Sequence, residues 1–254
     1  GPVGAVNLHY GNKYDDVSYN NILVSSCANE GILAFTGDGT NPEVMKSATD
    51  AIKSVSGLGI PTVKPWNIDT IKEKLNLVKN SGAIAIAMDI DAAGLPFLKN
   101  MNPPAGAKSV SELKEIIEIS NLPFIIKGIM TVKGALKAKE AGATAIVVSN
   151  HGGRVLDCTP GAADVLPAIA KAVKGKTIIL ADGGVRTGVD VLKLIALGAD
   201  GVLIGRPFVT ASFGGGTEGV EIYVNKIISE LEATMRLTGC ATIADIDERV
   251  IFSK

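Results

Sequence analysis

The feature that most constrains the fold is a unit that recurs along the chain. A short apolar run ends in polar or glycine residues, and a helical pattern of ten or more residues follows it. The apolar runs predicted as strands are Val3–Val6, Ile32–Thr36, Ile60–Lys64, Ala83–Met88, Phe124–Lys127, Ala145–Ser149, Thr177–Ala181 and Gly201–Ile204. Helices are predicted to begin near Tyr14, Pro42, Ile68, Ser109, Val132, Ala162, Gly188 and Glu218.

Strands that alternate with helices favour right-handed crossovers and a parallel sheet. Eight such units in 254 residues fit an α/β fold with a single (β/α)8 TIM barrel, which would span residues 1–254 as one domain. A doubly wound open sheet is the alternative. That fold would place phosphate-binding glycines after the first strand, and GPVGAVNLHYG is a poor match to the expected fingerprint.

Signals at helix ends support this segmentation. Ser109 and Glu112 have the spacing of a capping box. Gly142 and Gly198 stand at helix exits just before the next apolar run, where a left-handed residue commonly ends a helix.

The composition excludes several classes of partner. The net charge is −1 and neither sign clusters, which argues against a nucleic-acid surface and against a lysine-rich face that binds membranes. No apolar run reaches the roughly 18–20 residues that span a bilayer, and the first residues lack the pattern of a signal peptide. The three cysteines are isolated, which favours reduced thiols and a cytoplasmic location.

The candidate site lies where the predicted strands end. In a (β/α)8 barrel the C-terminal ends of all strands meet at one mouth, which holds the active site. The residues just past the strands are mostly polar or charged: Thr36, Asp38, Lys64, Trp66, Asp89, Asp91, Lys127, Ser149 to Arg154, Asp182 to Arg186, Gly205 and Arg206. A single acid or lysine there is often only solvated. Lys127 is different, because it interrupts the apolar run PFIIKGI, where an unpaired ammonium would be costly to bury. An anionic or electron-rich group is therefore expected to face it.

A phosphate site is predicted from the last two strands. The segments ADGGVRTG and IGRPF each combine glycine with arginine. Paired glycines let backbone N–H groups approach a phosphate, and Arg186 and Arg206 would add charge-assisted bonds. Phosphate sites in this fold often form after strands 7 and 8.

The turn in VVSNHGGRVLD carries the candidate chemistry. The chain has two histidines, and His9 is interpreted as structural. His151 lies in a glycine-flanked turn with Arg154 at the predicted mouth. A neutral imidazole can accept a proton near pH 7, and a guanidinium can bind a carboxylate through two parallel bonds. The pair would hold a small carboxylate substrate while His151 takes a proton from it, with Asp91 as the candidate for orienting the ring.

With these motifs, the chain resembles the FMN-dependent α-hydroxy acid oxidase and dehydrogenase family. SNHGGR, DGGVRTG and GRP match the family signature in order and spacing, and PFIIKGI resembles its flavin-contacting lysine segment. The resemblance covers roughly Ala83 to Phe208 well and the first three units loosely. It implies an enzyme that oxidises a 2-hydroxy acid to a 2-oxo acid with FMN as cofactor and without a metal, and it leaves a homo-oligomer open.

The resemblance also implies residue roles. His151 would be the base, Asp91 its orienting partner, and Arg154 the ligand of the substrate carboxylate. Lys127 would lie near the flavin N1–C2 carbonyl edge, and the backbone from Val3 to Ala5 would lie against the ring. The expected cofactor contacts are Val3, Gly4, Ala5, Thr36, Lys64, Asp89, Lys127, Ser149, Asp182, Gly183, Gly184, Arg186, Gly205 and Arg206.

The chain departs from the family pattern in ways that bear on substrate choice. It is expected to lack the N-terminal segment that carries an active-site tyrosine. A second substrate arginine is absent after strand 4, where Lys99 is nearby, and Asp89 stands where threonine is usual. Lys64 and Trp66 occupy the region of a glutamine and a tyrosine. Two alternatives stay open: an isomerase that uses reduced FMN, of the type 2 isopentenyl-diphosphate isomerase kind, and a non-catalytic flavin-binding barrel.

Overall fold

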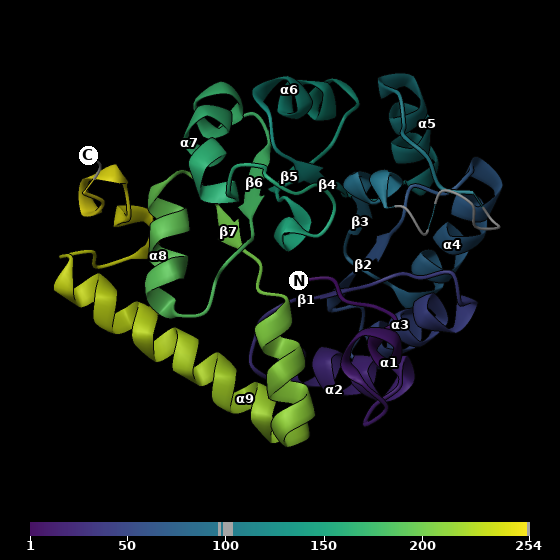
Figure 1. The fold of residues 1–254 in the computed structure, drawn as a ribbon, viewed down its shortest axis with the longest axis horizontal. Helices are drawn as coiled ribbons and strands as arrows, with labels where there is room; N and C mark the ends of the chain where they lie inside the picture. Colours follow the sequence, from purple (N-terminus) through teal and green to yellow (C-terminus); the bar gives the residue numbers. More distant parts are fainter. Residues whose placement is uncertain (96–97, 99–103, 253–254) are drawn as a thin grey trace.

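The computed structural model describes residues 1–95, 98 and 104–252, and its framework is a parallel sheet. Seven strands in this part of the chain follow one another in the sheet in sequence order, each parallel to the next (Figure 1). They are β1 (Ala34–Thr36), β2 (Gly59–Val63), β3 (Ile86–Asp89), β4 (Phe124–Ile129), β5 (Ala145–Val148), β6 (Ile178–Ala181) and β7 (Gly201–Val202).

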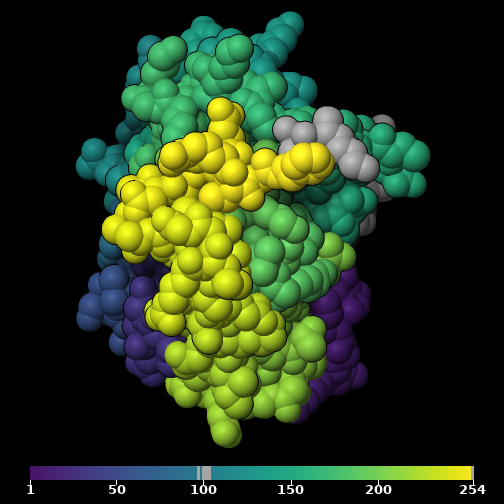
Figure 2. All heavy atoms as spheres, turned by 90° about the vertical axis from the view of Figure 1, so that its left-hand side faces the viewer, coloured from purple at the N-terminus to yellow at the C-terminus, as the bar shows by residue number. Residues whose placement is uncertain are grey.

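Helices surround the strands (Figure 1). The α-helices are α1 (Val6–Tyr10), α2 (Asp16–Asn29), α3 (Pro42–Ser54), α4 (Ile68–Ser81), α5 (Val110–Ser120), α6 (Val132–Glu140), α7 (Ala162–Val173), α8 (Gly188–Ala196) and α9 (Arg206–Leu237). Short 3-10 helices are η1 (Ile90–Gly94), η2 (His151–Gly153), η3 (Ile243–Asp245) and η4 (Glu248–Val250). The end of α9 and the residues after it lie across α8 on one face of the molecule (Figure 2). Among the described helices, none combines the length and the apolar character that crossing a bilayer requires.

The predicted helix ends are observed. The Ser109 side chain accepts a hydrogen bond from the Glu112 backbone and the Glu112 carboxylate accepts one from the Ser109 backbone, so the capping box is present. Gly142 and Gly198 have φ values of 95° and 113°, which a side chain would strain.

The structure corrects two of the predicted elements. Val3–Val6 is not a strand, because Ala5 adopts a left-handed conformation with φ 52° and the chain turns there into α1. The last helix begins at Arg206 rather than near Glu218. The glycines at 214–216 are poor helix formers, so the sequence pattern did not predict a helix before them. Only Gly216, with φ 60°, departs from helical geometry.

The sheet curls so that its two edge strands approach each other. Side chains from β1 and β7 or just beside them, including Phe35 and Leu203, line one apolar cleft. At the C-terminal end of this gap, the Gly1 ammonium donates to the Ile204 carbonyl over 2.6 Å. On the other side of the gap, a Cβ at Gly37 would lie 2.4 Å from the Val3 carbonyl carbon. Gly1 and Val3 therefore lie in the gap between the two edges, although the described residues show no strand pairing there.

Alternation along the strands determines which side chains reach the mouth. Ala87, Ile125 and Val147 belong to the apolar cluster on one face of the sheet, with Phe35, Ile60, Ala85, Ala145 and Leu203. Because side chains two positions apart share a face, Asp89, Lys127 and Ser149 continue the same face toward the C-terminal end. All three are buried. The interior of the curled sheet thus changes from apolar to charged at the end where the candidate site lies.

Candidate active site

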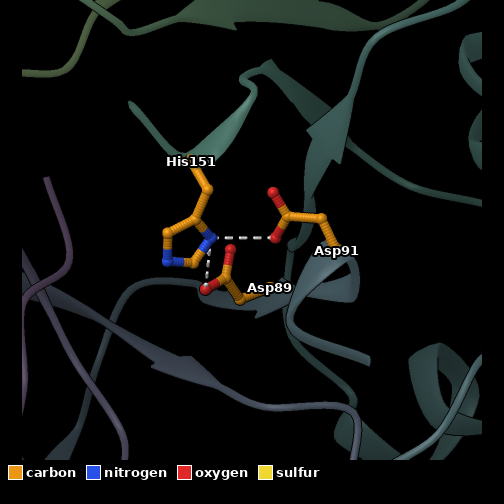
Figure 3. Close-up of side chains that lie close together, drawn as sticks. All are labelled: Asp89, Asp91 and His151. Carbon is orange, nitrogen blue, oxygen red and sulfur yellow. Dashed lines mark hydrogen bonds and ion pairs between the residues drawn. The ribbon is translucent and has the colours of Figure 1, made fainter. Parts of the chain in front are cut away.

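His151 lies between two carboxylates at the C-terminal end of the sheet (Figure 3). Its Nδ1 is 3.0 Å from Asp91 Oδ1 and 3.4 Å from Asp89 Oδ2. Asp91 is the partner that the sequence analysis proposed, and it lies in η1, directly after β3. With the ring proton on Nδ1, the imidazole donates to Asp91, and Nε2 has no hydrogen-bond partner among the described residues. That nitrogen is free to accept a proton.

The turn after β5 holds the imidazole in place. Ser149 Oγ accepts a hydrogen bond from the His151 backbone over 3.1 Å, and Asn150 Oδ1 accepts one from Gly153 over 3.2 Å. His151, Gly152 and Gly153 have consecutive φ values of 58°, 66° and 77°. Two glycines accept this conformation readily, but for a histidine it costs about 1–2 kcal/mol, so the surroundings must stabilise it.

A glycine on the neighbouring strand gives Asp91 its room. Gly128 has φ 103°, and a Cβ there would lie 2.7 Å from Asp91 Cγ. Sequence reasoning did not single out Gly128. The only signal was its position directly after Lys127 in the apolar run.

Lys127 is buried in a cluster of acids. Its Nζ is 3.1 Å from Asp89 Oδ1 and 3.8 Å from Asp182 Oδ2. Burial alone would lower the pKa of Lys127, but Asp89, Asp182 and Asp91 together raise it above its usual value. The anionic partner expected for this lysine is therefore Asp89, a residue that the sequence analysis assigned only to the cofactor.

The two acids beside His151 differ in their ionisation. Burial acts to raise the pKa of Asp89, but Lys127, His151 and Lys64 hold it at about 2. Burial raises the pKa of Asp91, and the neighbouring Asp89 charge raises it further. The hydrogen bond from His151 acts to lower this pKa, but the net shift is upward. One ligand atom from each of Asp89, Asp91 and His151 lies within 4.8 Å of the others, a spacing that a metal ion could bridge. Lys127 already compensates the Asp89 charge, so we interpret the group as a hydrogen-bonded ion cluster.

The predicted phosphate residues line one cleft together with Lys127, His151 and Arg154. These residues are Asp182, Gly183, Gly184, Arg186, Gly205 and Arg206. The φ values of Gly183 and Gly184 are 102° and 75°, so glycine is needed at both positions. Arg186 Nη1 donates to the Val185 carbonyl over 2.8 Å, and Arg206 Nη2 donates to the Gly152 carbonyl over 3.4 Å. Each guanidinium has five N–H donors, so both keep capacity for an anion.

A second cleft adjoins the first at His151 and Arg154. It also contains Val3, Gly4, Ala5, Lys64 and Asp89, all of which the sequence analysis expected at the cofactor. His9, which was interpreted as structural, lines it as well. Burial lowers the pKa of His9, and the nearby Arg154 and Lys64 charges add to this effect. The sequence held no signal for this position of His9.

Some candidate residues lie behind the clefts. Thr36 and Ser149 are fully buried, and neither lines either cleft. Trp66 is also fully buried, and its Nε1 donates to Asp38 over 2.6 Å. Asp38 in turn forms a 2.7 Å ion pair with Lys74. Lys99 lies outside the described residues.

The first cleft fits a cofactor with one phosphate. Its open glycine backbone and two partly free guanidiniums suit an anion, as expected for such a turn. Asp182 Oδ1 is a buried oxygen without a hydrogen-bond partner among the described residues, and so is Thr36 Oγ1. Buried oxygens of this kind usually have partners, and the hydroxyl groups of a ribityl chain would supply donors for Asp182.

Comparison with known proteins agrees with this fit. The family model described as FMN-dependent dehydrogenase matches residues 99–253. The chain is 45% identical over 144 residues to a 2-hydroxyacid oxidase of Dictyostelium discoideum, covering 57% of this chain and 37% of that protein. It is 48% identical over 136 residues to an L-lactate oxidase of Lactobacillus jensenii, covering 54% of this chain and 33% of that protein.

Solved structures extend the likeness to nearly the whole chain. A Pediococcus acidilactici protein described as a lactate oxidase superimposes with a TM-score of 0.83 at 29% identity, covering 98% of this chain and 73% of that one. A mandelate oxidase superimposes with a TM-score of 0.79 at 26% identity, covering 96% and 75%.

The matches to curated relatives span only part of those proteins, 37% and 33% of the two lengths given above. The family match nevertheless covers more than half of this chain. FMN is the cofactor that the match indicates. The chain belongs to the FMN-dependent dehydrogenase family.

Proposed function

We propose that the chain is the flavin-binding part of an enzyme that oxidises a 2-hydroxy acid to a 2-oxo acid. The observation that carries the proposal is the His151–Asp91 pair, which adjoins both the anion cleft and Arg154. The names of the relatives, 2-hydroxyacid oxidase and L-lactate oxidase, point to the same class of substrate.

Each residue has a defined task in this reaction. Arg154 binds the substrate carboxylate through paired hydrogen bonds, which brings the 2-carbon to the boundary between the two clefts. His151 accepts one of the two protons that the substrate loses, at Nε2, and Asp91 stabilises the resulting imidazolium. Bound FMN would accept the two electrons that leave the 2-carbon, together with the second proton. Lys127 provides positive charge beside the cofactor cleft.

We also propose that the cofactor contacts are those expected from the sequence. Gly183, Gly184, Arg186, Gly205 and Arg206 would hold the phosphate, and Asp182 the ribityl chain. Val3, Gly4, Ala5, Lys64 and Asp89 would face the ring from the second cleft. Thr36 and Ser149 would support the site from behind, the latter through its bond to the His151 backbone.

The proposed fold is the complete (β/α)8 barrel. Its support is the position of the two sheet edges, which share one apolar cleft, and of residues Gly1 and Val3 in the gap between them. An eighth strand in this gap would satisfy the free edges of β1 and β7, which otherwise leave backbone groups unpaired. The proposed location is cytoplasmic, on the ground that Cys27, Cys158 and Cys240 are free.

The cofactor proposal predicts FMN rather than FAD in the purified protein, because the cleft offers one phosphate cradle. Mass spectrometry of the released flavin decides this. Arg206→Ala should weaken FMN binding by about 1.5–3 kcal/mol, the value of a hydrogen bond to a charged group. Arg236→Ala is the matched control, since Arg236 pairs with Glu232 on the exposed face of α9. Equal affinities for FMN in the two variants would remove Arg206 from the site.

Anaerobic mixing with a panel of 2-hydroxy acids tests the activity. The proposal expects at least one of them to bleach the flavin absorbance and to yield the matching 2-oxo acid. Readmission of O2 then shows whether oxygen is the electron acceptor. Bound FMN that no 2-hydroxy acid reduces would refute the proposed activity, and isopentenyl diphosphate would be the next substrate to try.

A further inference from the structure

Asp89 uses both of its oxygens to join two functional side chains. Oδ1 is 3.1 Å from Lys127 Nζ. Oδ2 is 3.4 Å from His151 Nδ1, the contact drawn in Figure 3. The sheet register fixes the first contact, because Asp89 in β3 and Lys127 in β4 are direct neighbours across the ladder. Asp89 is only 5% exposed. The residue therefore lies between Lys127 and His151, in the wall of the second cleft.

The hydrogen-bonding needs of His151 do not explain a second carboxylate. Nδ1 carries a single proton, and Asp91 accepts it at 3.0 Å, the shorter of the two contacts. Asp89 therefore acts on the imidazole mainly through its charge. Burying that charge is costly unless it is paired, and Lys127 provides the pairing. Lys127, Asp89 and His151 thus form one line of alternating charge once the imidazole is protonated.

We propose that Asp89 is a positioning residue that links the base to the cofactor lysine, stabilising protonated His151 and offsetting the Lys127 charge. This inference rests on the proposed function, in which His151 takes a proton and Lys127 lies beside the flavin. Neutralising Asp89 would therefore change two properties at once: the stability of protonated His151 and the effect of the Lys127 charge on the flavin.

The charged groups around the imidazole come from several elements. Asp89 and Asp91 face it from β3 and η1, and Lys127 lies behind Asp89 on β4. Arg154 of the same turn, His9 of α1, and Lys64, Asp38 and Asp182 from other strand ends line the adjoining clefts. Arg206 reaches the Gly152 carbonyl next to His151. In this setting the two carboxylates are the groups in contact with Nδ1, so removing either charge should make the imidazolium less stable.

The direct test is an NMR titration of the His151 imidazole in the 254-residue protein. With two histidines in the chain, His9→Asn assigns both signals. Asp89→Asn keeps the size of the side chain and removes its charge. An opposite charge at this distance typically shifts a pKa by one unit or more, so the pKa of His151 should fall by about one unit, a tenfold loss of proton affinity.

Two further variants make the titration decisive. Asp200→Asn is the matched control, because Asp200 also pairs with a lysine, Lys174, but precedes β7 at the opposite end of the sheet, and it should leave the His151 titration unchanged. Asp89→Asn/Lys127→Met removes both buried charges, and the pKa of His151 should still fall because the negative end of the pair faces the ring. An unchanged His151 titration in either Asp89 variant overturns the proposal. So does a loss of the fold in both, which would make the pair a structural element.

The flavin provides an independent readout. Without the Asp89 charge, Lys127 should favour added electrons more strongly, so Asp89→Asn should raise the reduction potential of bound FMN and Lys127→Met should lower it. If Asp89→Asn leaves the reduction potential of FMN unchanged or lowers it, Asp89 does not offset the Lys127 charge. If the protein binds no FMN, the proposed function fails, yet the histidine titration still decides whether Asp89 acts on His151.

Discussion

At the scale of single residues, Arg154 should be irreplaceable by lysine. Arg154→Lys keeps the positive charge but loses the planar pair of donors that matches a carboxylate. Substrate binding should weaken, and flavin reduction should also slow because the 2-carbon is held less well. Stopped-flow reduction across a range of substrate concentrations separates the two effects. FMN affinity should remain, since Arg154 is not assigned to the phosphate. A variant with unchanged affinity for substrate would show that another cation binds the carboxylate.

The site residues that could be predicted from the sequence are those whose polar or charged side chains contrast with the residues next to them in the chain. Lys127 interrupts an apolar strand, and His151 lies in a turn of two glycines. The placement of His9 and the need for glycine at position 128 depend on contacts between distant segments, which no local pattern encodes. The pairing of Asp89 with Lys127 depends on the register between β3 and β4. Register is a property of the assembled sheet, so the sequence predicted only an unspecified anionic or electron-rich partner for Lys127.

At the scale of elements, the contact between α8 and α9 requires a glycine. A Cβ at Gly188 would lie 2.1 Å from the Leu231 backbone nitrogen, so the two helices would have to separate. Gly188→Ala should destabilise the protein by about 1–3 kcal/mol, the range seen when a packed interface is overfilled. Gly214→Ala in α9 is the matched control, because its Cβ would meet no atom within 4 Å. That variant should be stabilised by up to about 1 kcal/mol through helix propensity. Chemical denaturation of both variants measures the difference, and equal stabilities would contradict the packing argument.

The elements themselves were predictable wherever periodicity and end signals agreed. Seven apolar runs overlap the strands of the sheet, and the capping box at Ser109 marks the true start of α5. The run Val3–Val6 was wrongly predicted as a strand, since its four residues are equally consistent with a loop entering α1. Composition could not reveal that Ala5 turns the chain, because alanine has no preference for the left-handed conformation it adopts there.

At the scale of the whole molecule, Asp89 should contribute to acid sensitivity. Its pKa is about 2 in the folded protein against a usual value of 3.8, so its charge stabilises the fold above about pH 4. That contribution, on the order of 2 kcal/mol, is lost as the pH falls from about 4 toward 2. Asp91 has the opposite effect on stability. Its pKa is raised, so protonation at low pH removes the cost of burying its charge. Thermal unfolding of Asp89→Asn should therefore show a lower Tm than the wild type at pH 6 and a flatter decline between pH 4 and 2. Parallel declines in the two proteins would contradict the assignment.

The central claim is that His151 is the base in the oxidation of a 2-hydroxy acid, and one measurement tests it most directly. His151→Gln keeps a hydrogen-bonding side chain but cannot accept the proton efficiently. Single-turnover flavin reduction by the best substrate of the panel, followed anaerobically by stopped flow, should slow by about 10²–10⁴-fold relative to the wild type. FMN binding should be retained and substrate affinity should change less. Reduction at the wild-type rate in His151→Gln would contradict the account and leave the turn after β5 with a structural role only.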